Sequence, residues 1–144
     1  MLRHFSPQSR QIIDEAQDIA RQYKQEYVDG EHVLLAMVEK DHGRASKVLR
    51  QAGVTPGKLR QSIEPFFRQP SGSAGTVTGR LPGTLHVRNV VAHAVEIAEQ
   101  HKAPAVEPEH LLLAISREAD SLAVQALNGF GLDSSRIERM LGEG

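Results

Sequence analysis

Apolar residues recur every three or four positions along most of the chain, the spacing that places them on one face of a helix. Residues 12–23 show this clearly, and they follow Ser6-Pro7, an N-cap residue with a proline at the first helical position. No segment alternates between apolar and polar residues for long enough to indicate a strand. The pattern therefore predicts an all-α protein.

Eight short helices are expected, four in each half of the chain. Each start is marked by a capping residue or by a glycine, and Gly53 and Gly131 mark two of the ends. The predicted cap or first residues are Ser6, Asp29, Arg44, Thr55, Thr84, Glu107, Ser121 and Asp133. Residues 33–38 have no polar face, so the second helix is expected to be the most buried element.

The two halves are copies of one another. The heptapeptide EHVLLAM at 31–37 recurs as EHLLLAI at 109–115, an offset of 78 positions. Between the copies, 68–83 is rich in Gly, Ser, Thr and Pro and is predicted to be a flexible linker. Each copy alone would have a thin core. We therefore expect one domain of two pseudo-symmetric four-helix repeats, repeat one at 5–67 and repeat two at 84–141.

The net charge, the length of the apolar runs and the absence of Cys argue against several classes of function. The formal net charge is −1 and the basic residues form no block, which disfavours nucleic acid as a partner. No apolar run approaches the ~20 residues of a membrane span. A soluble, cytoplasmic protein without a membrane partner is expected. The chain has no Cys, which excludes disulfides, thiolate zinc sites and cysteine nucleophiles.

Catalytic and metal motifs are incomplete. The glycines Gly53 and Gly57 are separated by three residues rather than the four of a phosphate-binding loop, and Leu59 stands where a Ser or Thr is needed. The repeated Glu-His pairs lack the second histidine of a zinc helix. The pair His86 and His93 lacks a third ligand. We predict no metal, no cofactor and no enzymatic activity.

The duplicated pattern resembles a known family. An Ala-x-x-Ile-Ala segment precedes each Glu-His-Leu-Leu-x-Ala-type run and an Ala-x-x-x-Leu-x-x-x-Gly segment follows it, over about 5–141. This arrangement is similar to the Clp N-terminal repeat domain of the AAA+ unfoldases ClpA, ClpB and ClpC, and the ClpC type looks closest. The resemblance implies a non-catalytic module that binds unfolded or marked protein substrates and adaptor proteins for an AAA+ ring.

Two interpretations of Glu31 and Glu109 stay open. Both fall in the first turn of a predicted helix, where the helix dipole stabilises a carboxylate by about 0.3–1 kcal/mol. The resemblance implies a second role, because the matching glutamates of some ClpC-type domains line two symmetric pockets for phosphoarginine. The threonine that commonly precedes this glutamate in ClpC-type repeats is replaced by Gly30 and Pro108. The neighbouring His32 and His110 are expected to be structural.

The pair Phe66-Phe67 is a candidate apolar substrate surface. Consecutive helical residues point about 100° apart, so both rings cannot face one core. Either one ring is exposed and helps to form a groove, or the second ring packs on the linker or on the other bundle.

Two further functions stay open beside that of a docking domain. One is a free-standing adaptor or scaffold of the same fold. The other is a helical nucleic-acid-binding regulator, which short helices separated by glycines superficially suggest. That class needs a basic recognition helix. Segment 44–51 carries three basic residues, whereas its counterpart 121–130 carries none.

Overall fold

The computed structural model describes residues 5–67 and 80–143. This part of the chain contains eight α-helices, one short 3-10 helix and no β-strand, which confirms the predicted all-α fold with two four-helix repeats. The elements in chain order are α1 (Pro7–Gln22), α2 (Gly30–Glu39), α3 (Arg44–Gln51), α4 (Pro56–Ile63), the 3-10 helix η2 (Glu64–Phe66), α5 (Leu85–Gln100), α6 (Pro108–Ser116), α7 (Leu122–Gly129) and α8 (Ser134–Glu143).

Local capping chemistry sets the helix boundaries. The Ser6 hydroxyl accepts the Ser9 backbone N–H at 3.1 Å and caps α1, and Thr84 caps α5 in the matching way at 3.2 Å from the nitrogen of Val87. After α3 and α7, the chain turns at Gly53 (φ 83°) and Gly131 (φ 77°), a left-handed conformation that favours glycine. The sequence predicts these boundaries. The expectation that Phe66 and Phe67 are both helical is wrong, because α4 ends at Ile63, Phe66 closes the 3-10 helix and the backbone of Phe67 is extended.

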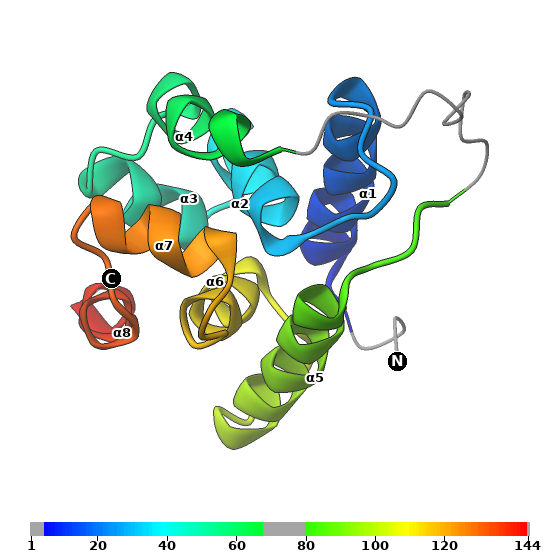
Figure 1. The fold of residues 1–144 in the computed structure, drawn as a ribbon. Coiled ribbons are helices and arrows are strands. Elements are labelled where there is room, and N and C mark those ends of the chain that lie inside the picture. Colours follow the sequence, from blue (N-terminus) through cyan, green and yellow to red (C-terminus); the bar gives the residue numbers. More distant parts are fainter. Residues whose placement is uncertain (1–4, 68–79, 144) are drawn as a thin grey trace.

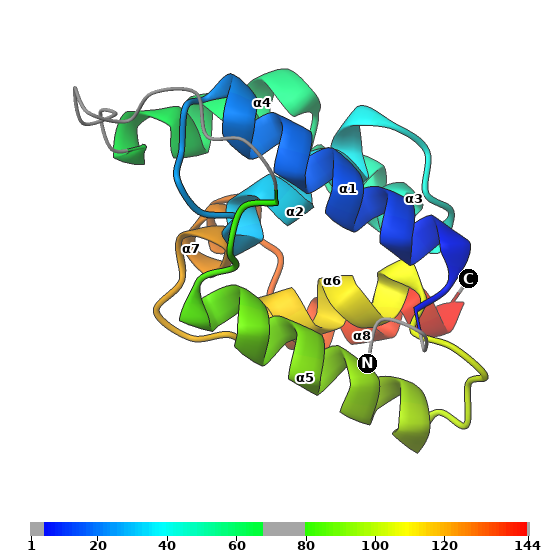
Figure 2. The ribbon, with the colours of Figure 1, turned by 90° about the vertical axis from the view of Figure 1, so that its right-hand side faces the viewer.

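The two repeats pack around α2 and α6, which lie at the centre (Figures 1 and 2). Within each repeat the central helix packs on its own first, third and fourth helices. Contacts between the repeats come in pairs that the repeat symmetry relates. The contact of α2 with α7 corresponds to that of α6 with α3, and the contact of α4 with α7 corresponds to that of α8 with α3. In the same way, the contact of α1 with α6 corresponds to that of α5 with α2. Every residue from Gly30 to Met37 is buried. The two repeats therefore share one core.

Backbone bridges also join the repeats. Phe5, just before α1, forms an isolated parallel bridge with Val106, just before α6, and Val28 forms the equivalent bridge with Gly83. In each bridge a residue that leads into one repeat pairs with the loop before the central helix of the other. The second bridge places the start of α5 beside the start of α2, where the candidate site lies.

Part of the predicted linker lies outside the described residues, namely 68–79. Of its last residues, Leu81 is buried in the core. The side-chain amide of Gln17 donates to the Leu81 carbonyl at 2.9 Å and accepts its N–H at 2.8 Å. The chain is therefore fixed against α1 before α5 begins. Among the described residues, no helix is both long enough and apolar enough to cross a membrane.

Candidate functional site

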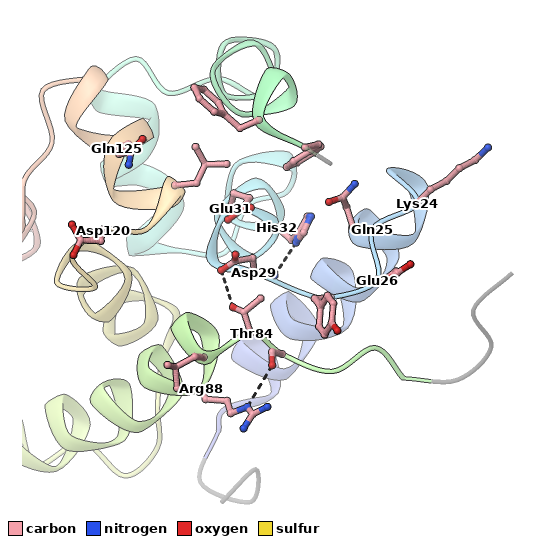
Figure 3. Close-up of a pocket in the computed structure, with 16 residues that line it drawn as sticks. Lys24, Gln25, Glu26, Asp29, Glu31, His32, Thr84, Arg88, Asp120 and Gln125 are labelled. Atoms are coloured by element: carbon pink, nitrogen blue, oxygen red, sulfur yellow. Dashed lines mark hydrogen bonds between the residues drawn. The ribbon is translucent and has the colours of Figure 1, made fainter. Parts of the chain in front are cut away.

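A cavity of about 810 Å³ lies where the starts of α2 and α5 meet, and we refer to it as the α2 cavity. Figure 3 shows Glu31 and Asp29 at the start of α2, with Thr84, the cap of α5, facing Asp29. The guanidinium of Arg88 is turned away from Glu31 and donates to the backbone carbonyl of Gly83 at 3.4 Å. The Thr84 hydroxyl donates to an Asp29 carboxylate oxygen at 2.9 Å. This bond ties the cap of α5 to the cap of α2, so both repeats build the cavity.

Glu31 is buried in this cavity without a full set of partners. The residue is only 6% exposed, and its Oε1 atom has no hydrogen-bond partner. Burial, reinforced by the negative charge of Asp29, raises the pKa of Glu31 to about 7, against smaller opposing effects of its own backbone N–H and of His86. The hydrogen bond from its own backbone N–H is a helix-start contact, and the Oε1 atom remains unpaired beside it.

His32 and its counterpart His110 have a structural role, as predicted. The Nδ1 atom of each accepts the backbone N–H of the N-cap residue, Asp29 or Glu107, at 2.9 Å, which completes a capping box. Burial lowers the pKa of both imidazoles, that of His32 to about 4. His32 is therefore neutral at pH 7, and its buried Nε2 has no partner.

Exposed apolar side chains surround the mouth of the α2 cavity. Among the described residues, the large hydrophobic side chains that are exposed are Tyr27 (53%), Phe66 (65%) and Leu85 (70%), and all three line this cavity. Large apolar side chains gathered at one cavity are typical of a binding surface. Sequence reasoning singled out Phe66 but missed Tyr27 and Leu85, because their exposure depends on where the two repeats meet.

The two phenylalanines have different surroundings. Phe66 is exposed, whereas Phe67 packs with its edge on Tyr23, at 4.7 Å between ring centroids, and lies 5.4 Å from the ring of His32. One ring of the pair is therefore exposed, as the first of the two interpretations expects. Among the described residues, Phe67 packs on side chains of its own repeat.

Glu109 lies in a second, smaller cavity of about 360 Å³ at the start of α6. Its side chain is 20% exposed, and its Oε2 atom is 3.8 Å from the guanidinium of Arg44 on α3. The two glutamates thus occupy matching places in the fold but have different neighbours. They lie in two separate cavities and do not form one site.

One histidine of the pair on α5, His86, is hydrogen-bonded to a carboxylate. The Nδ1 atom of His86 is 2.9 Å from Glu118, whose hydrogen bond raises the pKa of that imidazole. Asn89 donates to the same carboxylate oxygen at 3.0 Å. In the part of the chain that the structure describes, no group of three or more His, Asp or Glu side chains is suited to hold a metal ion.

Comparisons with known proteins agree with this architecture. The family model of the Clp repeat (R) N-terminal domain matches residues 4–130 and 83–143. The chaperone protein ClpB 1 of a Nostoc species is 31% identical over 93% of the chain, and the chloroplastic chaperone protein ClpC1 of Arabidopsis thaliana is 31% identical over 99% of it. The chain spans about 15% and 16%, respectively, of the length of these two relatives.

Solved structures share the fold at lower identity. The N-terminal domain of the chaperone ClpD from Arabidopsis thaliana superposes with a TM-score of 0.76 at 17% identity, covering 98% of this chain and 94% of that one. The ClpV N-domain in a complex with a VipB peptide superposes with a TM-score of 0.75 at 15% identity, covering 99% and 90%. Together with the sequence matches, these likenesses show that the chain belongs to the Clp repeat N-terminal domain family.

Proposed function

We propose that the chain is the substrate- and adaptor-docking N-terminal domain of a Clp-type ATP-dependent unfoldase, and that peptide segments dock in the α2 cavity. The observation that carries this proposal is the gathering of Tyr27, Phe66 and Leu85 around one cavity. The chain spans only about 15% of a ClpB relative, so ATP-driven unfolding would belong to the rest of such a protein. The complex of a ClpV N-domain with a VipB peptide supports peptide docking on this fold.

The interior of the cavity favours a cationic side chain. A guanidinium that reaches Glu31 supplies a charge-assisted hydrogen bond to the unpartnered Oε1 atom. Lys24 and Arg88 also line the cavity, and each must turn from its position in Figure 3 to meet a phosphate on that guanidinium. We therefore propose that the ligand is an arginine or phosphoarginine side chain flanked by apolar residues, with Glu31 as the docking carboxylate. Glu109 is the candidate for the same role in repeat two.

The apolar part of this proposal predicts a loss of affinity in Phe66→Ser and Leu85→Ser. The probe is the fluorescein-labelled pentapeptide Ser-Leu-Arg-Leu-Ser, with and without phosphate on arginine, called here the arginine pentapeptide. Each substitution removes apolar area that the bound peptide would cover, so Kd should rise about tenfold in fluorescence anisotropy. The melting temperature should stay the same, because both side chains are exposed in the free protein.

Gln11→Ser on the exposed face of α1 is the control, since Gln11 does not line the cavity. The control variant should bind like the wild type. Unchanged binding by both Phe66→Ser and Leu85→Ser would contradict docking at this cavity.

A further inference from the structure

The two glutamates differ in the side chain that the opposite repeat presents to them. Arg44, the first residue of α3, lies in the cavity of Glu109, and Leu122, the first residue of α7, lies in the cavity of Glu31. Arg44 and Leu122 are separated by the same 78 positions as Glu31 and Glu109. Repeat one therefore supplies a guanidinium where repeat two supplies an apolar side chain.

Arg44 is held at two points in the smaller cavity. Its guanidinium lies 3.8 Å from Glu109 and also donates to the backbone carbonyl of Leu141 in α8. The other carboxylate of this cavity, Glu138, is paired with Arg117 at 3.3 Å. Both carboxylates that line the smaller cavity thus face a guanidinium of the chain itself. In the α2 cavity, by contrast, the Oε1 atom of Glu31 has no partner.

We propose that Arg44 is a built-in occupant of the Glu109 site, so that the domain has one carboxylate without a cation of its own, Glu31, and one that its own side chain occupies. This inference rests on the proposed docking role of Glu31. An incoming guanidinium at Glu109 must compete with the ion pair of Arg44, which its hydrogen bond to Leu141 holds in place. At Glu31 it displaces no cation of the protein. Repeat symmetry predicts two similar sites, whereas Arg44 makes them unequal.

Exchanging the two facing residues tests the proposal. Arg44→Leu gives the Glu109 cavity the residue that faces Glu31, and Leu122→Arg does the reverse. The arginine pentapeptide is titrated into the whole chain while nitrogen–proton correlation NMR follows the amide signals of Glu31 and Glu109 separately. In the wild type, affinity at Glu109 should be at least tenfold weaker than at Glu31. Arg44→Leu should remove that difference, and Leu122→Arg should weaken binding at Glu31 at least tenfold.

Arg44→Gln serves as a second variant, because its amide can still donate to the carbonyl of Leu141 while the charge is lost. It should open the Glu109 site as Arg44→Leu does. Equal affinities at the two sites in the wild type would overturn the inference and leave the proposed function standing. So would a Glu109 site that stays weak in both Arg44 variants while Glu31 binds.

A wild type that binds nowhere, with variants at Arg44 that bind at Glu109, would support the closed site and contradict docking at Glu31. Binding at neither position in any variant would overturn both proposals.

Discussion

Repeat one expressed alone, as residues 1–67, is expected to show no cooperative thermal transition. Its central helix α2 is covered by α6 and α7 of the other repeat, and α1 packs on α6. Without repeat two, the apolar faces of these helices are exposed and Phe5 and Val28 lose their bridge partners. A single four-helix unit of this size buries too little surface for ordinary stability.

Circular dichroism during heating measures this expectation. The full chain should unfold in one sharp transition, because its repeats share one core. The fragment should show weak helical signal and a gradual change with temperature. Mixing it with residues 80–144 is the control, and helical signal should increase in the mixture. A sharp transition of the isolated fragment near the melting temperature of the full chain would contradict the shared core.

Glu31→Gln is expected to change the pH dependence of stability by about 3 kcal/mol. The pKa of Glu31 is raised to about 7 from its ordinary value of 4.5, so between these two pH values the folded state holds a proton that the unfolded state has released. The contribution of Glu31 to the free energy of unfolding is therefore complete below pH 4.5 and is lost as pH rises through 7. Glutamine cannot ionise, so relative to the wild type the variant should become more stable as pH rises from 4.5 to 8.

The titration of His32 changes stability in the opposite direction. In the wild type it therefore offsets part of the pH dependence that Glu31 causes. Its pKa is lowered to about 4 from 6.5, so its contribution is complete above pH 6.5 and is lost as pH falls through 4. Urea unfolding of the wild type and of Glu31→Gln between pH 4 and 8 isolates the glutamate, because the His32 contribution is common to both. Glu109→Gln, at the partly exposed glutamate that faces Arg44, is the matched control. A constant difference between wild type and Glu31→Gln across this range would contradict the buried, uncompensated state of Glu31.

The sequence predicts those parts of the fold that follow local rules. Ser6 and Thr84 cap helices by bonding a backbone N–H three residues ahead, which depends only on nearby residues. Gly53 and Gly131 end helices for a similarly local reason. The repeat at an offset of 78 then predicts the pairing of halves, because two similar amphipathic units can bury their apolar faces against each other.

The candidate site could be predicted only in part. The heptapeptide places Glu31 and Glu109 at equivalent helix starts, yet one carboxylate is buried without a partner and the other faces Arg44. That difference comes from residues of the opposite repeat, and no local pattern shows which of them reach across. The backbone bridges were also missed, because a single bridged residue such as Phe5 has no strand periodicity around it.

The central claim is that Glu31 in the α2 cavity receives a cationic side chain of a docked peptide, and calorimetric titration of the arginine pentapeptide tests it most directly. At pH 8, above the pKa of about 7, the carboxylate is ionised and the wild type should bind one peptide per chain. Glu31→Gln should bind at least tenfold more weakly, for the loss of about 1.5–3 kcal/mol of a charge-assisted hydrogen bond, and the matched variant Glu109→Gln should bind like the wild type. Equal binding by the wild type and Glu31→Gln would contradict the claim.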